Sequence, residues 1–400
     1  MRILIAEDER ITRASLTRQL QSWGHTVAAA EDGEQAWEMF NAGEFDIVLT
    51  DWEMPRLSGL ELVERLRSAR SSAGSSASNA ADRFVYIIML TGRSEKTDLV
   101  RGIEAGADDF VSKPFDREEL RVRLLAGDRI VQLERRLSEH NERMRADLLA
   151  ASRVQRAMLP RTNLSTPHAA AAWTYVPTDE LAGDAIGLHL IADRYLVSYV
   201  IDVSGHGVPA ALLAVTAMHA LSLDALETAL LAHGGDPHPD RVVADLNRRF
   251  CASDNSGLFL TMILSVLDTH TGSLRMARAG HPLPIVLRAD GTPVAVSDDG
   301  GLPIALMADT DYPPVSMTLQ PGDRVYLFSD GFLEQPRAGA DKDVQYGEDR
   351  LRESLAALAR VPGEKVVDRA VDDLARWAGG RSFVDDVSLV AIEYFGGAAG

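Results

Sequence analysis

The sequence has little cysteine, no long apolar run and no excess of basic residues. Its one cysteine, Cys251, excludes an intramolecular disulfide framework, is typical of a reducing cytosol and is expected in the core. No apolar run approaches the ~20 residues of a membrane span, and residues 1–6 are too short for the apolar part of a signal peptide. A net charge of −18 would repel the phosphates of nucleic acids and anionic membranes. We therefore expect a soluble cytoplasmic protein with no nucleic-acid or membrane partner.

The chain is long enough for two or three domains, at roughly 100–200 residues each, and 46% of its residues are hydrophobic. In the first 125 residues, apolar strands alternate with helical patterns, which predicts a doubly wound parallel sheet. The pattern identifies four strands, at Ile3–Ala6, Phe45–Thr50, Phe84–Leu90 and Asp109–Ser112. The small residues at 71–79 predict a flexible loop without a site.

Polar side chains follow these strands, at the edge of the sheet where the sites of such folds lie. They are Glu7, Asp8, Asp51, Thr91 and Lys113. Three carboxylates that converge in one crevice repel each other unless a divalent cation joins them, so the sequence predicts a cation site here.

These motifs resemble the receiver domain of response regulators, of the CheY-like type, which implies five parallel strands and a domain at 1–125. Asp51, which precedes Met54–Pro55 and Gly59, matches the phosphoacceptor. The resemblance implies that a histidine kinase phosphorylates Asp51, and that Glu7 and Asp8 hold Mg²⁺ together with it.

The same resemblance implies a conformational switch in the receiver. Thr91 matches its hydroxyl residue, Phe110 its aromatic residue and Lys113 its lysine, with the customary cis-proline at Pro114. The alternative is a receiver fold that has lost phosphorylation. Since no key position is missing, phosphorylation is the expectation.

A long helix is expected from Asp116, which can cap its first turn, to Met158, because no proline occurs before Pro160. Steps of three and four residues trace a mostly apolar heptad seam through Ile130, Leu133, Leu137, His140, Met144, Asp147, Ala151, Val154 and Met158. Two interpretations stay open. The helix forms a parallel coiled coil that makes a homodimer, with a linker at 126–160, or it packs as an amphipathic helix on its own domains.

The stretch from Tyr195 to Ala214 joins a buried strand to a long helix. Asp202 ends the strand, two glycines follow in Ser204–Gly207, and Pro209 lies in the first turn of the helix. A carboxylate at the tip of a strand, followed by exposed carbonyls, suits a cation that prefers oxygen ligands. The alternative is a capped turn in which Asp202 is a local hydrogen-bond acceptor.

Beyond Pro160, runs of strands with helices set apart predict two antiparallel sheets covered by helices on the outside. The expected strands are 171–176, 188–192, 195–201, 259–267, 273–279, 283–288, 315–319, 324–328 and 386–394. The expected helices are 209–231, 239–251, 346–359 and 363–377.

Acidic residues recur at the ends of these strands, at Asp184, Asp202, Asp330 and Asp385–Asp386. They resemble the metal-dependent protein phosphatases of the PPM family, in its SpoIIE/RsbU-like branch, over a domain at 161–396. The ending of the long helix, from Ala151 to Pro160, is similar to the helix that precedes the catalytic domain in that family.

The family resemblance implies an αββα sandwich that binds two Mn²⁺ or Mg²⁺ ions. It assigns the metal ligands and catalytic carboxylates to Asp184, Asp202 with the Val203 carbonyl, Asp330, and Asp386 in preference to Asp385. Two ions about 3.5–4 Å apart neutralise a phosphate and lower the pKa of a water between them. Such a site needs no cysteine nucleophile.

Two histidines near these motifs, His206 and His281, could donate a proton to the leaving group, although loop packing is the other interpretation. His281 lies in an Ala-Gly-His motif that the family shares. The chain departs from the family at Gly187, where a further acid is frequent, and at Ala182, where glycine is usual. A third metal is therefore in doubt.

Together these features predict a two-component response regulator whose output is a phosphoserine and phosphothreonine protein phosphatase. The family resemblance implies a substrate among anti-sigma-factor antagonists of the STAS type, in a partner-switching pathway. The alternative is a catalytically silent adaptor that binds a sigma factor or an anti-sigma partner, and such an adaptor would lack metal carboxylates. A DNA-binding regulator is disfavoured by the charge and by the lack of a basic recognition helix.

Overall fold

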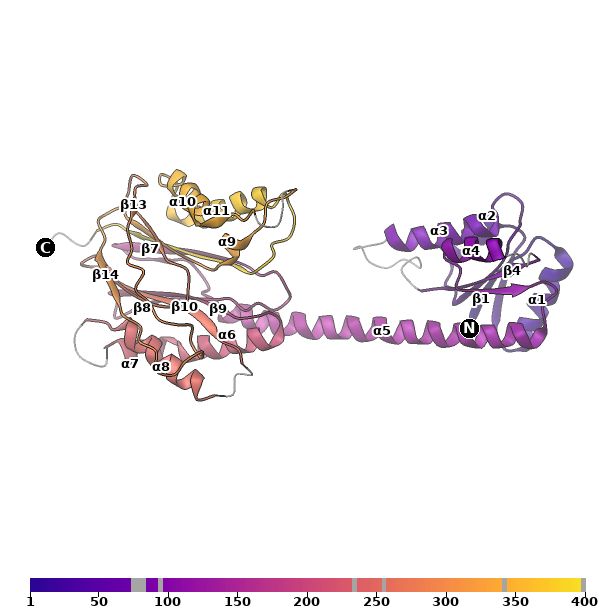
Figure 1. Ribbon diagram of the computed structural model, residues 1–400, viewed down its shortest axis with the longest axis horizontal. Helices are drawn as coiled ribbons and strands as arrows, with labels where there is room; N and C mark the ends of the chain where they lie inside the picture. Colours follow the sequence, from indigo (N-terminus) through magenta and orange to yellow (C-terminus); the bar gives the residue numbers. More distant parts are fainter. Residues whose placement is uncertain (73–83, 93–95, 232–235, 254–256, 340–343, 397–400) are drawn as a thin grey trace. The chain divides into compact units, whose positions relative to one another are not determined.

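The computed structural model of the chain describes residues 1–72, 84–92, 96–231, 236–253, 257–339 and 344–396 (Figure 1). Most of the predicted loop at 71–79 therefore lies outside the described residues. The chain forms two compact units, Met1–Arg145 and Ala146–Gly400.

The N-terminal unit contains a five-stranded sheet in the order β2-β1-β3-β4-β5, and all its pairs are parallel. Its strands are β1 (Arg2–Ala6), β2 (Thr26–Ala30), β3 (Ile47–Asp51), β4 (Tyr86–Thr91) and β5 (Asp109–Ser112). Its shorter helices are α1 (Arg10–Ser22), α2 (Gly33–Ala42), α3 (Gly59–Ser72) and α4 (Lys96–Glu104). The doubly wound fold is confirmed, although β2, with three alanines on the edge of the sheet, was not identified from its sequence.

Each face of this sheet has its own core. Leu4 and Val48 pack with Leu62 of α3 on one face, while Ile3 and Leu49 pack with residues of α1 and α5 on the other. Burial on both faces explains the continuous apolar strands. It also leaves the carboxyl ends of β1, β3 and β4 as the place where polar side chains gather.

The helix α5 (Arg117–Met158) begins as its sequence predicts. Asp116 Oδ1 accepts hydrogen bonds from the backbone N–H groups of Glu118 at 2.7 Å and Glu119 at 3.2 Å. In the heptad seam, Leu133 is 64% exposed and Val154 is 65% exposed. Both interpretations of the seam, a coiled coil and an amphipathic helix packed on its own domains, stay predictions.

The C-terminal unit contains two antiparallel sheets. One has the order β14-β11-β10-β9-β8 and the other β13-β12-β15-β16-β7-β6. The first comprises β8 (Ala185–Ile191), β9 (Tyr195–Val203), β10 (Leu260–Asp268), β11 (Ser273–Ala279) and β14 (Val315–Thr318). The second comprises β6 (Leu164–Ser165), β7 (Ala169–Val176), β12 (Ile285–Leu287), β13 (Pro293–Val294), β15 (Arg324–Phe328) and β16 (Val387–Tyr394).

Helices cover the outer faces of both sheets (Figure 1). Those of the first sheet are α6 (Val208–Ala220), α7 (Leu223–Leu231) and α8 (Pro239–Cys251). Those of the second are α9 (Gly331–Glu334), α10 (Gly347–Ala357) and α11 (Gly363–Trp377). Helices α6 and α8 contact β9 and β11, and α11 contacts β7 and β16. The predicted sandwich of two antiparallel sheets between helices is confirmed.

The single helix predicted at 209–231 is wrong, because the structure bends it by 54° between α6 and α7. Ser222 lies at the break, where its N–H donates to the His219 carbonyl and its carbonyl accepts from Leu226 N. Serine is a favourable residue at the start of a helix, so a new helix can begin here although no proline or glycine marks the break in the sequence. Among the described residues, no helix on its own has the length and hydropathy to cross a membrane, whereas α6 and α7 reach these limits only when taken as a pair.

Candidate active site

Strand β9 carries Asp202 and Val203 to one end of the first sheet. The strand is flanked by β8 and β10, and Asp202 lies opposite Thr261. Beyond it, Gly205 and Gly207 have φ values of +84° and +79°, a region that side chains rarely adopt. These turns lead into α6, so the carboxylate of Asp202 and the carbonyl of Val203 stay at the tip of the strand.

The second sheet brings two further acidic segments to this place. Asp330 follows β15 and starts α9, and Asp385–Asp386 precedes β16, the strand paired with β15. Gly331 makes the approach possible, because a Cβ atom there would lie 2.1 Å from the Asp386 carbonyl oxygen. Only glycine fits such a contact without displacing the backbone.

The two neighbours Asp385 and Asp386 have different roles in the structure. Asp386 Oδ1 accepts hydrogen bonds from Thr178 N at 2.8 Å and Thr178 Oγ1 at 3.0 Å, and its Oδ2 accepts from Gly183 N at 2.9 Å. Asp385 is exposed, and its charge acts directly on Asp202 and Asp330. Asp386 thus ties chain segments together, while Asp385 is the more exposed of the two.

Asp184 lies just before β8 and is 3% exposed. Its Oδ2 accepts a hydrogen bond from Ser388 Oγ at 2.6 Å. Ser329 Oγ accepts from Ser388 N and donates to the Asp386 carbonyl, so the serines connect both acidic segments. Burial, and then the charge of Asp202, raise the pKa of Asp184 well above its usual range.

The other acids also repel each other in surroundings that exclude water. Burial, followed by the charges of Asp330, Asp385 and Asp386, raises the pKa of Asp202 to about 7. Burial and the charge of Asp385 raise the pKa of Asp330 to about 6. Carboxylates that oppose each other's ionisation are a donor set that fits divalent cations with oxygen ligands.

Within the described ranges, these acids do not form a cluster in which three carboxylate oxygens lie within 4.8 Å of one another. That distance is suited to the ligands of a single ion. A pair of ions about 3.5–4 Å apart distributes its ligands over a wider area, so the looser arrangement is compatible with two ions.

The two candidate histidines are in opposite surroundings. The side chain of His206 is 92% exposed, and its Nδ1 lies 3.9 Å from Asp179 Oδ2. Burial raises the pKa of Asp385, which lies close enough to His206 for the two groups to interact electrostatically. His281 is 1% exposed, and burial lowers its pKa to about 3. Its Nδ1 lies 2.8 Å from Thr261 Oγ1, and Thr261 also hydrogen-bonds Asp202. Of the two, His206 is open to solvent, whereas His281 is buried against Thr261.

The two departures from the family pattern have physical explanations. At Gly187, a Cβ atom would lie 2.1 Å from the Tyr199 ring, so an acidic side chain cannot enter without moving that ring. Ala182 is buried, and its backbone N–H and carbonyl both bind the side chain of Gln155. Sequence reasoning missed the roles of Gln155, Thr178 and Ser388, because a polar residue in a strand or helix gives no sign of a distant partner.

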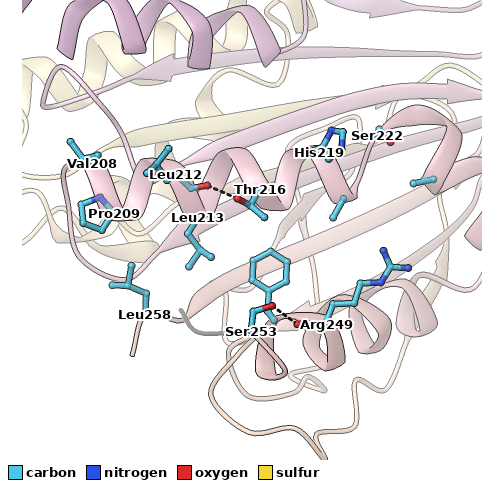
Figure 2. Close-up of a pocket in the computed structure, with 13 residues that line it drawn as sticks. Val208, Pro209, Leu212, Leu213, Thr216, His219, Ser222, Arg249, Ser253 and Leu258 are labelled. Carbon is cyan, nitrogen blue, oxygen red and sulfur yellow. Dashed lines mark hydrogen bonds between the residues drawn. The ribbon is translucent and has the colours of Figure 1, made fainter. Parts of the chain in front are cut away.

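A groove lies between α6 and α8 (Figure 2). Figure 2 shows Leu212 and Thr216 of α6 on one side, and Arg249 of α8 with Ser253, which follows that helix, on the other. Its lining is mostly apolar and contains no carboxylate. The groove is thus a different kind of surface from the acidic site.

The receiver unit gathers its own acids more tightly. Carboxylate oxygens of Glu7, Asp8 and Asp51 lie within 4.8 Å of one another, which is a suitable set for one divalent cation. Lys113 Nζ lies 2.8 Å from both Glu7 Oε2 and Asp51 Oδ2. Burial raises the pKa of Glu7, although the hydrogen bond with Lys113 opposes this. For Lys113, burial would lower the pKa, but hydrogen bonds with Asp51 and Glu7 outweigh it and raise the pKa.

The remaining receiver residues surround Asp51. Gly59 packs so closely that a Cβ atom there would lie 1.8 Å from the Asp51 carbonyl oxygen. Thr91 is buried at the end of β4, and the peptide bond between Lys113 and Pro114 is cis. The Phe110 ring packs against Gly102 of α4, where a Cβ atom would come within 2.6 Å of it.

Comparison with known families agrees with both units. The family model described as Stage II sporulation protein E (SpoIIE) matches residues 192–395, just over half of the chain. The chain belongs to the SpoIIE family. A second model, the response regulator receiver domain, matches residues 3–125. The molecule is therefore a response regulator receiver joined to a SpoIIE-family domain.

Curated relatives match over a limited length. Response regulator MprA of Mycobacterium ulcerans is 40% identical over 134 residues, which are 34% of this chain and 53% of that protein. Response regulator MprA of Mycobacterium leprae is 40% identical over 126 residues, 32% of this chain and 50% of that protein. The chain thus spans about half the length of the curated relatives it matches.

Among solved structures, the SiaA-PP2C domain of Pseudomonas aeruginosa is similar with a TM-score of 0.52 and 23% identity, covering 64% of this chain and 98% of that one. The RsbU and RsbW domains of a Mycobacterium tuberculosis protein give a TM-score of 0.47 and 26% identity, covering 57% and 60%. The first likeness shows that the C-terminal unit has a PP2C-type fold.

Proposed function

We propose that this response regulator has a metal-dependent phosphoprotein phosphatase as its output. The observation that carries the proposal is the convergence of acids from four chain segments. Burial and mutual repulsion raise the pKa of Asp202 to about 7 and that of Asp330 to about 6. Such repulsion is costly without a cation, and phosphate hydrolysis is the chemistry that a pair of cations favours.

The metal ligands that we propose are Asp202 with the Val203 carbonyl, Asp330, Asp385 and Asp184. We replace Asp386 by Asp385, because the buried Asp386 already accepts three hydrogen bonds, from Thr178 and Gly183, whereas the exposed Asp385 accepts one, from Asp386 N. Two Mn²⁺ or Mg²⁺ ions, when bound, supply neutralisation of the phosphate charge and acidify water.

The chain's own residues orient this site. Thr261, held by His281, fixes the Asp202 carboxylate, and Ser388 fixes that of Asp184. His206, which is exposed and interacts electrostatically with Asp385, is our candidate for the proton donor to the leaving oxygen.

The receiver is proposed to control this activity. A histidine kinase would phosphorylate Asp51, with one Mg²⁺ held by Glu7, Asp8 and Asp51 and with Lys113 beside the acceptor. Phosphorylation changes the populations of two receiver states only if it stabilises one of them more. Thr91 and Phe110 are proposed to change position between the two receiver states.

For the substrate, membership in the SpoIIE family supports a phosphoserine or phosphothreonine on a STAS-type anti-sigma-factor antagonist, in a partner-switching pathway.

We further propose a homodimer through the exposed seam of α5, whose Leu133 and Val154 need a partner. Light scattering of the full chain tests it, and a monomer with and without a phosphoryl mimic contradicts it. In domain terms, we propose a receiver at 1–125, a linker at 126–160 and a phosphatase at 161–396.

The central experiment is hydrolysis of p-nitrophenyl phosphate and of a phosphoserine peptide by the purified chain with Mn²⁺. We expect Asp202→Ala to lower turnover by about 100-fold or more, because charge stabilisation by metal ions contributes several kcal/mol to catalysis. Asp309→Ala, which makes the same substitution at an exposed acid outside the proposed ligand set, is the matched control. If Asp202→Ala equals the unmodified chain, the enzyme proposal fails and the silent adaptor becomes the better interpretation.

A further inference from the structure

Gln155 is an unusual residue in α5. It is 3% exposed, although the residues on both sides of it are exposed. Its side-chain Nε2 donates to the Ala182 carbonyl at 2.7 Å, and its Oε1 accepts from Ala182 N at 3.3 Å. A primary amide can donate one hydrogen bond and accept another at the same time. Here both partners are backbone groups of one residue, Ala182.

The bound residue, Ala182, begins the segment that carries a proposed metal ligand. Gly183 N donates to Asp386 Oδ2, and Asp184 accepts from Ser388 Oγ. The segment also packs closely against the end of β9, because a Cβ atom on Gly183 would lie 3.1 Å from the Val203 carbonyl oxygen. A shift at Ala182 therefore moves Asp184 and changes the contact with Val203.

The same helix also contributes to the N-terminal unit. Leu120, Leu124 and Val131 of α5 are buried in one of the receiver cores. Helix α5 runs from Arg117 to Met158, so the same helix that carries these residues also carries Gln155 near its C-terminal end. Any rotation of the last turns changes the two hydrogen bonds to Ala182.

We infer that Gln155 is a positioning residue that couples α5 to the metal site, by holding residues 182–184 in the geometry that binds divalent cations. This inference rests on the proposed function, since it names a means of regulating the same site. Gln155 acts through the backbone of Ala182 and does not touch the substrate. A partner of this kind, behind a metal ligand, typically changes metal affinity or activity by about 10–100-fold when removed.

The test compares Gln155→Met, which keeps the length of the side chain without its amide, with Arg153→Ala on the exposed face of the same turn. Both are made in the full chain with Asp8→Ala, so that Mn²⁺ binding to the receiver is weakened in every sample. Calorimetric titration measures Mn²⁺ affinity directly, and turnover is measured against Mn²⁺ concentration.

We expect Gln155→Met to weaken Mn²⁺ binding about 10-fold or more, while turnover at saturating Mn²⁺ stays within about 3-fold of the unmodified chain. Arg153→Ala should change neither. A residue with only a structural role would lower stability or maximal turnover without this selective change in affinity. Unchanged Mn²⁺ affinity in Gln155→Met overturns the inference.

Hydrogen exchange in the unmodified chain decides the matter even if Gln155→Met does not fold. The inference requires slow exchange at the amide of Ala182 without metal, and a changed rate there when a small phosphodonor is added. Fast exchange, or a rate that the phosphodonor does not change, overturns it. Absence of turnover in the unmodified chain would instead contradict the proposed phosphatase, while the affinity and exchange results still test Gln155.

Discussion

The two acidic sites of this molecule differ in whether a basic side chain offsets the charge of their carboxylates. In the receiver, Lys113 lies 2.8 Å from both Glu7 and Asp51 and offsets part of their charge. In the C-terminal unit, no lysine or arginine of the described residues forms a salt bridge with Asp202, Asp330 or Asp385, and the hydrogen-bond donors nearby are hydroxyl and N–H groups.

This difference indicates what each site does with a cation. A lysine beside the acceptor lets the receiver keep its acids together before an ion binds, and it remains as a partner for a phosphorylated Asp51. The C-terminal acids lack this compensation and become fully ionised only at a cost. We therefore expect divalent cations to affect the C-terminal unit more strongly than the receiver.

The largest effect is expected when Asp385 and Asp386 are replaced one at a time and the two variants are compared. We expect Asp385→Asn to reduce turnover by about 100-fold, since a metal ligand is lost, with little loss of stability. We expect Asp386→Asn to lower the free energy of unfolding by about 1–3 kcal/mol, because an amide cannot accept hydrogen bonds at both ends. Turnover and thermal unfolding measure the two. The reverse pattern would restore Asp386 as the ligand.

The next effect concerns pH in the absence of metal. Because folding raises the pKa of Asp202 to about 7, the folded protein binds its proton more tightly than the unfolded chain does. This contribution to stability is present at low pH and is lost as the pH rises to about 7. Relative to Asp202→Asn, the metal-free chain should lose about 1–3 kcal/mol between pH 4 and pH 8.

Thermal unfolding in a chelator measures this difference, and equal pH profiles for the two proteins would contradict it. With Mn²⁺ present the trend should reverse, because the ions bind ionised carboxylates and displace protons. Stabilisation by Mn²⁺ should therefore grow between pH 6 and pH 8.

The smallest effect is expected in the receiver. Removing the positive charge of the lysine side chain in Lys113→Met should tighten Mg²⁺ binding by about 3–10-fold, because the ammonium group repels the ion. Calorimetric titration in an Asp202→Ala background limits the signal to the receiver site. If Mg²⁺ binding weakens instead, Lys113 supports the cation site and the comparison between the two sites is wrong.

The secondary structure was predictable where a pattern is local. The strand that carries Asp202 follows from a short apolar run rich in β-branched and aromatic residues, and the helix capped by Asp116 from a helical pattern. Strand β2 was missed because its alanines pack only through their place at the edge of the sheet. The break at Ser222 was missed because no glycine or proline marks it, and the very short β6, β13 and α9 give no periodicity.

The acids of the site were visible in the sequence, but their roles were not. Asp385 and Asp386 are neighbours of the same type, and only the contacts with Thr178 and Gly183 distinguish them. Ser388 and its partner Asp184 are 204 residues apart, so no local pattern connects them.

The sequence by itself determined the order of the elements, the family and which carboxylates stand at the ends of strands, because these depend on side-chain type and spacing along the chain. Only the tertiary structure decided which carboxylate oxygens are already hydrogen-bonded, which histidine is accessible and that Gln155 holds Ala182. The physical reason is that hydrogen bonding, burial and charge repulsion act through space, between segments that folding alone brings together.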